Sequence, residues 1–509
     1  MTRNADRYRI ELDVGAGASR DAGPPRVETP FSILLVGDFG GRREGDHLAP
    51  AAGEAKPRAR RPILVDRDSI DEVISRVGPV LRLTVSPGRS PIEIRFSGLD
   101  DFTPDRLYER LPHLQSLREA RERRGRSAMR SPPMPPSAGR AGEGGGLLDQ
   151  ILGDEPPPPA GGSGRSPRIH ESERYDSDEA FADFVRRAVA PHRVSGPDPE
   201  HDALVAETDR VIAAELRAIL HHPDFQRLES AWRGAAFLAR RLETGESLRL
   251  SLIDVTLGEL ARDLANLESS AVSPDSVARA IVRGDASSGD QPWTLLVGLY
   301  EFGASAEDLM LLARLAELAR AAGAVWLSAA APALVGAASF APSVEFDDWA
   351  TAANPAWDAV RGLEAAPHVG LISPRMLLRL PYGEDTDPCE ALPFEEFATE
   401  GAVDHADYLW GNGALAGALL LGDAFGRDGW TLRPDLHVTG LPLYIGHVDG
   451  AARATPCAES LLTDRAVLHM LGRGVMPLAS ARERDVARLA RFQSIAAPAK
   501  PLAGRWTIG

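Results

Sequence analysis

Residues 125–169 divide the chain, because their composition does not support a folded domain. The segment contains Pro-Pro-Met-Pro-Pro, Gly-Glu-Gly-Gly-Gly and a run of prolines followed by Ala-Gly-Gly-Ser-Gly. Such a composition buries too little apolar surface to offset the entropy of folding, so we predict a disordered linker. As a flexible coil of about 45 residues, it spans roughly 35–40 Å. Folded regions on either side can therefore meet in one molecule, or each can serve a different neighbour.

A short apolar island interrupts this linker. Leu147, Leu148, Ile151 and Leu152 fall on one face when the segment is placed on a helix. A segment that only connects two domains has no need of such a stripe. We therefore predict a short helix over 147–152 that serves as a docking segment on a tether.

The composition is that of a globular protein with room for more than one domain. The chain has 509 residues, of which 43% are hydrophobic and 26% charged. Its net charge of −16 argues against nucleic acid and anionic lipid as partners. We identify no secretory leader and no apolar run long enough to span a bilayer, so we expect a cytoplasmic location without membrane insertion. Cys389 and Cys457 are too few for a zinc site or a disulfide framework, which fits reduced thiols in a cytoplasm.

The region before the linker, residues 1–124, opens with a strand-like segment. Tyr8, Ile10, Leu12 and Val14 alternate with polar residues, which predicts a strand with one apolar face. A Gly/Ala/Pro-rich spacer follows, so we interpret the strand as an arm. Its backbone must pair either with its own domain or with a neighbouring subunit.

The rest of this region alternates predicted strands and helices. A buried strand at 31–37 ends in Gly-Asp-Phe-Gly-Gly-Arg. A helix begins at Thr103-Pro104, where Thr is the N-cap and Pro occupies the first helical position. Further strands are predicted at 63–65, 80–85 and 91–96, and further helices at 69–77 and up to about 124.

The region after the linker, residues 170–509, is larger and predicts an α/β fold. Strands alternate with helices, which favours a mixed sheet covered by helical layers. The predicted strands are 248–253, 294–300, 324–328 and 368–373, with later ones near 441–446 and at 475–478. The predicted helices are 175–189, 201–220, 224–242 and one near 458–472.

We identify no catalytic, cofactor-binding or metal-binding motif in the sequence. The turn at 37–41 follows a strand but lacks the Gly-Lys-Ser/Thr ending of a phosphate loop, so we interpret it as structural. His221 and His222 are adjacent and point apart on a helix, which makes them a poor metal pair and suits a helix end. Three carboxylate pairs are interpreted as solvated or capping groups. They are Asp100-Asp101, Asp347-Asp348 and Glu395-Glu396.

One aromatic cluster predicts a structural core motif. Phe225, Leu228 and Trp232 lie at i, i+3 and i+7, which places them on one buried helical face. Glu229 and Arg233 on the same helix form an i, i+4 pair.

A second aromatic cluster surrounds Trp410. The following Asn412-Gly413 is a turn or helix-start signal, and we favour a packed core corner there over a ligand pocket. An α/β enzyme that uses this turn, or the turn at 37–41, remains the enzymatic alternative.

The N-terminal region resembles the small subunit of the type VI secretion system contractile sheath, the TssB/VipA-like subunit. The similarity is carried by Tyr8–Val14, Pro30–Gly41, Val65–Ile74 and Phe96–Asp105. The C-terminal region is similar to the large sheath subunit, the TssC/VipB-like subunit. The matching pieces are Ile219–Gly234, Leu295–Gly303, Gly370–Gly383, Phe394–Glu396 and Leu409–Ala414. The island Leu147–Leu152 looks like the helical start of the large subunit.

This resemblance implies a non-enzymatic, tube-building protein without a cofactor, in which two normally separate subunits are fused. In the family, the heterodimer polymerises around an inner tube, arms exchange strands between neighbours, and contraction drives the tube outward; a baseplate is a further partner. An AAA+ ATPase recycles contracted subunits through the N-terminal helix of the large subunit. Here that handle corresponds to Leu147, Leu148, Ile151 and Leu152. Fusion fixes a 1:1 ratio and gives the two parts a high effective concentration.

The sequence departs from the family at its end. The chain stops at Gly509, before the C-terminal segment that usually supplies further strand-exchange elements. A sheath-derived cap, adaptor or scaffold that does not contract is therefore the alternative to a contractile protomer.

Overall fold

The computed structural model describes the chain in several ranges. They are residues 29–42, 61–85, 90–128, 199–268, 276–285, 289, 291–341, 344–350, 352–397, 403–448 and 451–508. These residues belong to two compact units, one formed by residues up to 114 together with 211–509, and one formed by 115–210. The predicted arm at 7–14, the helix predicted at 175–189 and most of the predicted linker, with its island at 147–152, lie outside the described residues.

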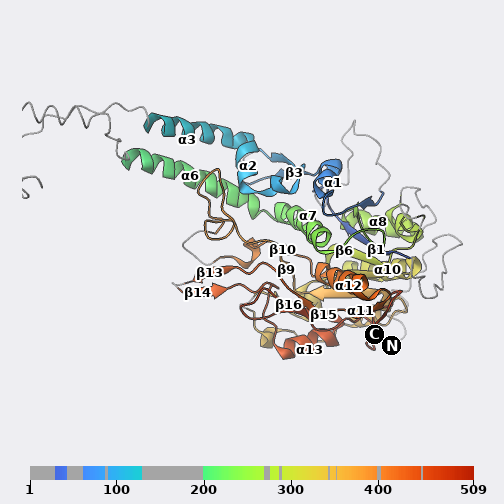
Figure 1. Ribbon diagram of the computed structural model, residues 1–509. Helices are drawn as coiled ribbons and strands as arrows, with labels where there is room; N and C mark the ends of the chain where they lie inside the picture. Colours follow the sequence, from blue (N-terminus) through green and yellow to red (C-terminus); the bar gives the residue numbers. More distant parts are fainter. Residues whose placement is uncertain are drawn as a thin grey trace, which may run out of the picture. The chain divides into compact units, whose positions relative to one another are not determined.

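A mixed sheet of nine strands forms the centre of the first unit among the described residues (Figure 1). Its order is β12-β16-β15-β8-β7-β6-β1-β5-β2. The strands from β15 to β5 in this order run parallel, whereas β16, β12 and β2 pair antiparallel with their neighbours. The strands are β1 (Phe31–Gly37), β2 (Ile63–Leu64), β5 (Leu248–Asp254), β6 (Leu295–Phe302), β7 (Val325–Ala330), β8 (Val369–Ser373), β12 (His437–Val438), β15 (Val475–Ser480) and β16 (Ala487–Leu489).

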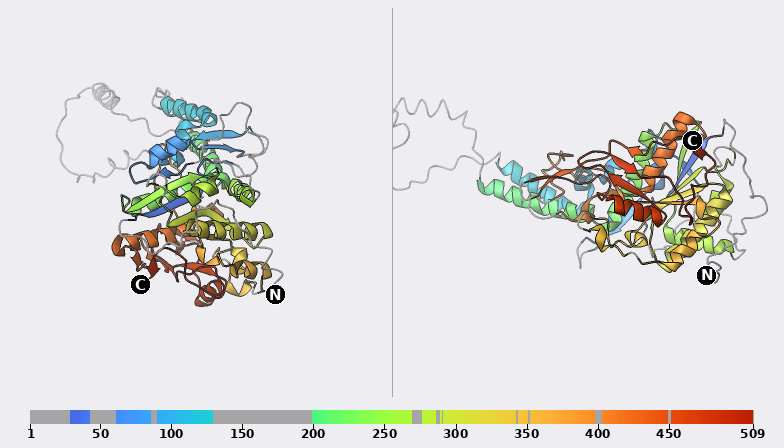
Figure 2. Two further views of the ribbon diagram at one scale, coloured as in Figure 1. Left: turned by 90° about the vertical axis from the view of Figure 1, so that its right-hand side faces the viewer. Right: turned by 90° about the horizontal axis from the view of Figure 1, so that it is seen from below.

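Strand β1 lies inside this sheet although it precedes the linker in the sequence. It pairs in parallel with β5 along its whole length and with Leu295–Gly298 of β6 on its other side. In the left view of Figure 2, the blue β1 lies among the green and yellow strands. The sheet therefore combines strands from both sides of residues 125–169 in one folded unit.

Helices cover β1 on both faces, which explains its composition. On one face, the Phe31 ring lies 4.9 Å from the Phe425 ring of α12 (Ala414–Asp428). On the other face, Leu34 and Val36 join the core cluster of α10 (Ala306–Ala322). Side chains alternate between the faces of a strand, so a strand buried on both faces reads as an almost continuous apolar run.

The parallel strands follow a doubly wound order. Across the sheet, five of these strands lie in the order β5-β1-β6-β7-β8. When the five are numbered by their order along the chain, this spatial order is 2-1-3-4-5. The chain passes from β1 to β5 on one side and then returns across β1 to form β6 on the other side. The carboxyl ends of β1 and β6 therefore form a topological switch point.

Smaller elements complete the first unit. Strand pairs are β3 (Val80–Leu83) with β4 (Ile92–Arg95), β9 (Met376–Leu377) with β10 (Trp410–Gly411), β11 (Thr431–Leu432) with β17 (Thr507–Ile508), and β13 (Ile445–Val448) with β14 (Ala451–Ala454). Other helices are α1 (Ile70–Val77), α2 (Pro104–Arg110), α7 (Pro223–Arg241), α8 (Leu257–Glu268), α9 (Val277–Arg283), α11 (Pro355–Arg361) and α13 (Asp464–Gly472). The predicted fold class, a large mixed sheet with helical layers, is confirmed.

The predicted helix start at Thr103 is also confirmed. The Thr103 hydroxyl oxygen accepts a hydrogen bond from the Arg106 N–H at 3.4 Å, and Pro104 is the first residue of α2. This cap satisfies a backbone donor that has no partner within the first helical turn.

The second unit contains α3 (Gln115–Ala128) and the part of α6 (Pro199–Leu220) up to residue 210. The rest of α6 belongs to the first unit. Helix α3 is longer than predicted, since residues 125–128 continue it into the predicted linker. Arg121 Nε donates to Asp209 Oδ1 at 2.7 Å within this unit. No helix in the described ranges combines the length and the apolar character needed to cross a bilayer.

Candidate functional site

The turn after β1 is held by a carboxylate from β5. Asp254 Oδ1 accepts hydrogen bonds from the N–H groups of Phe39 at 2.9 Å and Gly40 at 3.0 Å. The Arg42 guanidinium donates to the same oxygen at 2.8 Å, and the Arg42 N–H donates to Asp38 Oδ1 at 3.3 Å. These bonds fix the turn at 37–41 as a structural element, in agreement with its interpretation from the sequence.

Helix α7 packs against this turn. Trp232 Nε1 donates to the Phe39 carbonyl oxygen at 3.0 Å, and the two rings meet edge to face at 5.0 Å. Gly41 has a φ of 75°, and an added Cβ would lie 3.0 Å from Leu81 and 3.2 Å from Leu228. Both the positive φ and the close packing require glycine at this position.

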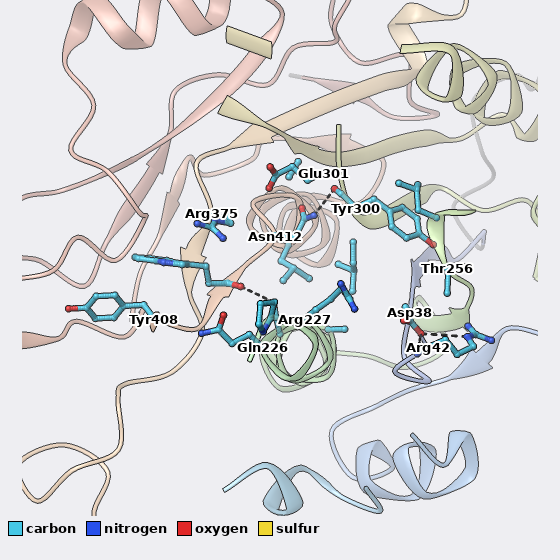
Figure 3. A pocket seen from close by; sticks show the side chains of 18 residues that line it. Asp38, Arg42, Gln226, Arg227, Thr256, Tyr300, Glu301, Arg375, Tyr408 and Asn412 are labelled. Carbon is cyan, nitrogen blue, oxygen red and sulfur yellow. Dashed lines mark hydrogen bonds and ion pairs between the residues drawn. The ribbon is translucent and has the colours of Figure 1, made fainter. Parts of the chain in front are cut away.

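A cavity of about 470 Å³ lies beside the turn (Figure 3). It is bounded by the turn after β1, α7, the end of β6 and the segment 408–415. Its charged lining residues are Asp38, Arg42, Arg227, Glu301 and Arg375. Its other polar or aromatic lining residues are Gln226, Ser230, Thr256, Tyr300, Tyr408, Trp410 and Asn412.

Most of the segment 410–414 is buried, and the segment also borders the cavity. Trp410 is buried, with 6% of its surface exposed, but it lines the cavity together with Asn412. The physical reason is the topology, because connections that leave β1 and β6 in opposite directions open a crevice between them. That strand order is not visible in the sequence.

The guanidinium groups of the cavity are paired with carboxylates. Arg42 contacts Asp254 at 2.8 Å, and Arg375 contacts Glu459 at 2.5 Å. Arg227 likewise contacts a carboxylate of its own helix at 2.5 Å.

Two carboxyl groups in the cavity are held in an environment that disfavours ionisation. Burial raises the pKa of Asp38, with Arg42 opposing the effect and the nearby Asp254 adding to it. Burial also raises the pKa of Glu301, with Arg375 opposing the effect. In both groups the main cause is the loss of solvation around the charged form.

A buried ion network joins α7 to the segment 374–396. Arg379 Nε donates to Glu229 Oε1 at 2.8 Å, and Arg379 Nη1 donates to Glu396 Oε2 at 2.6 Å. Arg233 donates to Glu229 Oε1 at 2.6 Å and to the Tyr382 hydroxyl at 2.8 Å. The predicted pair of Glu229 and Arg233 is thus part of a larger network.

The network corrects the interpretation of Glu396 as a solvated or capping group. Its side chain is 1% exposed, because Arg379 arrives from another part of the chain to neutralise it. Burial raises the pKa of Glu396, but the Arg379 guanidinium, the nearby His221 ring and the Tyr382 N–H outweigh burial and lower the pKa to about 2. A buried carboxylate is tolerated only with such partners.

Other carboxylates differ in their surroundings. Asp101 accepts from the Ser97 N–H at 2.6 Å, which is a capping role, and Asp347 pairs with Arg465 at 2.9 Å on the surface. Glu459 resembles Glu396, since His405 and Arg375 outweigh the effect of burial and lower its pKa to about 2.

The adjacent histidines lie where α6 meets α7. His222 Nδ1 accepts from the Asp224 N–H at 3.2 Å and caps α7. The His221 ring nitrogens lie 3.6 Å from Glu396 and 3.4 Å from Asp407. In the part of the chain that the structure describes, no three His, Cys, Asp or Glu side chains are grouped to hold a metal ion.

The structure places some of the sequence-predicted site residues and leaves others outside its ranges. Phe225, Leu228 and Trp232 are buried on α7, and Trp410 is buried on β10. The arm residues and the handle residues lie outside the described ranges. They are Tyr8, Ile10, Leu12, Val14, Leu147, Leu148, Ile151 and Leu152.

Sequence reasoning missed the central role of Arg379. A signal was present, because Arg379 is the charged residue of the apolar run Met376–Leu380. A charge inside such a run indicates a buried side chain that needs a partner. The partners, Glu229 and Glu396, could not be identified without the fold.

Comparison with known proteins gives two matches along this chain. Residues 202–496 match the family described as VipB (EvpB), tail sheath N-terminal domain, and residues 2–126 match the family described as type VI secretion system, VipA. The VipB match alone covers more than half of the 509 residues. This chain belongs to the type VI secretion sheath family.

Within the sheath family, one relative is the type VI secretion system sheath protein TssC1 of Pseudomonas aeruginosa. It is 32% identical over 310 residues, which are 59% of this chain and 62% of TssC1. The chain therefore spans less than two thirds of the length of this relative.

The VipA and VipB regions occur in one chain, which agrees with the predicted fusion of a small and a large sheath subunit. In these terms, β1 comes from the VipA region, whereas β5 and β6 come from the VipB region. The family is described as a sheath family, which is structural rather than enzymatic.

Proposed function

We propose that this chain is a fused protomer of a contractile type VI sheath, which polymerises around an inner tube and drives the tube outward on contraction. The position of β1 carries the proposal. This strand of the VipA region pairs with β5 and β6 of the VipB region. Without β1, two unpaired strand edges would open in the middle of a parallel sheet, so the two regions form one obligatory building block.

We assign the parts of this block from the sequence. Residues 1–124 correspond to the small subunit, residues 170–509 to the large subunit, and residues 125–169 connect them. The connector keeps the two regions in a 1:1 ratio and at a high effective concentration, so that every chain can complete its own sheet.

The arm is proposed to join one protomer to the next. Tyr8, Ile10, Leu12 and Val14 form an alternating apolar row, which suits a strand that adds to the sheet of a neighbouring copy. Backbone hydrogen bonds then hold the protomers together while the protomers change their relative positions during contraction.

The proposed partners follow from the sheath role. They are further copies of this chain, the inner tube protein, the baseplate and an AAA+ ATPase. The apolar residues Leu147, Leu148, Ile151 and Leu152 are proposed as the handle for this ATPase. The proposed location is the cytoplasm, and no reaction on a small molecule is part of the proposal.

Electron microscopy of the purified chain tests the proposal. We expect rings, tubes or filaments from the full chain, and folded single protomers from a variant that lacks residues 1–15. Circular dichroism and light scattering on the same samples separate a loss of assembly from a loss of folding. A full chain that stays monomeric over a wide concentration range contradicts the polymer.

A handle variant serves as the matched control. With Leu147, Leu148, Ile151 and Leu152 replaced by serine, tubes should form as before, but the ATPase should no longer extract subunits from them. If the arm deletion leaves polymers intact, strand exchange through the arm is wrong. If the full chain binds a sheath partner without forming polymers, a non-contractile adaptor replaces the contractile protomer.

A further inference from the structure

The cavity of about 470 Å³ occupies the topological switch point of the sheet. Asp38 and Arg42 follow β1, Tyr300 and Glu301 end β6, and Thr256 follows β5, as Figure 3 shows. In doubly wound sheets, ligands bind in this crevice outside the carboxyl ends of the strands. The volume falls within the range of small-molecule pockets.

The lining of the cavity carries more positive than negative groups. Its guanidinium groups come from the turn after β1 (Arg42), from α7 (Arg227) and from the segment after β8 (Arg375), and its carboxylates are Asp38 and Glu301. Three cationic groups against two carboxylates leave one positive charge. The lining therefore favours a ligand with a single negative charge.

The carboxylates behind the wall engage only part of each guanidinium group. Arg42 donates to Asp254 through Nη2, and Arg227 donates to Asp224 through Nη2. Arg375 donates to Glu459 through Nε and Nη2. A guanidinium group carries five N–H donors, so each arginine keeps donors for a ligand.

The clearest open donor is Arg42 Nε. This atom is buried and donates to no acceptor among the described residues. It lies 3.7 Å from Asp38 Oδ1, which is too far for a hydrogen bond. A buried donor without an acceptor costs free energy, and an acceptor supplied by a ligand would recover that cost.

The two carboxylates of the lining oppose an anion only weakly. Burial raises the pKa of Asp38 and so favours its neutral form, and Asp38 Oδ1 already accepts from the N–H groups of Gly41 at 3.1 Å and Arg42 at 3.3 Å. The Glu301 side chain is exposed, so solvent screens its charge. The charges of Arg42 and Arg227 both act on Asp38, which places these two guanidinium groups near the same carboxyl group.

The remaining wall includes an apolar surface. Leu299, Leu415 and the ring of Trp410 line the cavity, and the Arg375 guanidinium carbon lies 5.9 Å from the centre of that ring. A ligand that carries an apolar body beside its charged group can therefore bury apolar surface here.

We propose that this cavity binds a monocarboxylate with an apolar body, carried either by a free small molecule or by a side chain of another protein chain. Arg42 and Arg227 supply charged N–H donors in the planar arrangement that matches a carboxylate. Trp410, Leu299 and Leu415 contact the apolar body.

Calorimetric titration of the full chain with 3-phenylpropionate and 3-phenylpropionamide tests the charge requirement. The two ligands have the same shape and differ in one group, a carboxylate against a neutral amide. We expect the carboxylate to bind at least roughly tenfold more tightly, the difference expected for hydrogen bonds to a charged group. Equal binding of the two ligands, or no binding of the carboxylate, overturns the proposal.

The variant Arg227→Gln tests the donor. It should weaken 3-phenylpropionate binding by roughly tenfold or more. Because the Arg227 side chain is half-exposed on α7, the variant should keep the thermal melting profile of the parent chain. Arg240→Gln removes an exposed guanidinium group from the same helix outside the cavity and should leave the affinity unchanged. Unchanged affinity in a folded Arg227→Gln chain overturns the proposal.

Two further ligands identify the source and the size of the charge. Acetyl-Ala-Glu-Ala-amide binding as tightly as 3-phenylpropionate supports a protein side chain as the natural ligand, whereas loss of tripeptide binding with 3-phenylpropionate still bound supports a free carboxylate. Pyrophosphate is the polyanionic probe. Tighter binding of pyrophosphate than of 3-phenylpropionate overturns the proposal.

Discussion

Arg379 lies between two buried carboxylates, those of Glu229 and Glu396, at 2.8 and 2.6 Å. Removing three charged groups from water costs free energy, and the cost is offset only when all three remain together with good geometry. Arg233 and the Tyr382 hydroxyl extend the network and tie α7 to the segment after β9. Individual residues in this network are therefore far more sensitive to substitution than surface charges are.

The substitution Arg379→Met tests this sensitivity. It leaves Glu396 without its guanidinium and Glu229 with Arg233 alone, and we expect a loss of about 3–5 kcal/mol in the free energy of unfolding. Urea denaturation followed by tryptophan fluorescence measures the change. Arg106→Met is the matched control, since Arg106 forms a half-exposed pair with Glu109 at 2.9 Å and its loss should leave the urea midpoint unchanged. Equal midpoints for the two variants contradict the prediction.

The carboxylates also predict how stability depends on pH. The folded-state pKa values of Glu396 and Glu459 are about 2, below their ordinary value of 4.5. Their contribution to stability is therefore fully present above about pH 4.5 and is lost as the pH falls toward 2. We expect the urea midpoint to fall between pH 5 and pH 3, roughly the upper part of this window.

Two variants check the sign of this pH dependence. Glu396→Gln should be less stable at pH 7 and show a shallower decline toward acid. Glu301→Gln should be at least as stable as the parent chain at pH 7, because the raised pKa of Glu301 means that its ionised form opposes folding. A steeper acid decline in Glu396→Gln would show that Glu396 is not one of the responsible groups.

At the scale of single elements, the close packing of β6 against β7 depends on a missing side chain. The Trp326 Nε1–H donates to the Ser328 hydroxyl at 2.8 Å, and this hydroxyl donates to the Gly298 carbonyl oxygen at 2.8 Å. A Cβ at Gly298 would lie 2.6 Å from Ser328 Oγ and in closer conflict with the Trp326 ring. The indole can lie across β6 only because residue 298 is glycine.

We therefore expect Gly298→Ala to destabilise the chain by about 1–3 kcal/mol through overpacking. The matched control is Gly426→Ala on the exposed side of α12, where an added Cβ meets no atom within 4 Å. That change should be neutral or stabilise by about 0.5–1 kcal/mol, because alanine favours the helix. Thermal melting of the two variants measures the contrast, and a stable Gly298→Ala chain would mean that β6 and β7 separate easily.

At the scale of the whole molecule, β1 makes the VipA and VipB regions one folding unit. Leu34 and its neighbours are buried on both faces of the sheet, with β5 and β6 on either side. Removing β1 would leave the backbone groups of β5 and β6 that pair with it without partners. Both strands would therefore be destabilised at once.

Splitting the chain tests this dependence. Residues 199–509 expressed alone should be insoluble or aggregate, whereas co-expression with residues 1–128 should yield a soluble 1:1 complex. Leu34→Asp in the smaller fragment should abolish the rescue, because it places a charge at a fully buried position. Pull-down and size-exclusion chromatography measure the formation of the complex. If residues 199–509 alone are soluble and melt cooperatively, the prediction is wrong.

Local signals predicted much of the fold and some of the site. The apolar run at 31–37, the cap at Thr103 and the buried face of Phe225, Leu228 and Trp232 were visible because neighbouring residues in the sequence determine them. Helix α12 was not predicted. Eleven of its fifteen residues are buried, so most of the helix lacks the polar and apolar alternation that normally identifies a helix.

Sequence patterns were sufficient to predict the α/β class and to show the resemblance of each region to a sheath subunit, whereas the division at residues 125–169 stays a prediction. Three features became visible only in the folded chain: β1 lies between β5 and β6, Arg379 meets Glu229 across 150 positions, and a cavity lies beside Asp38. The physical reason is distance along the chain. Strand order, buried ion pairs and cavities arise from groups far apart in sequence, whose encounter depends on the free energy of the whole packed molecule rather than on any local pattern.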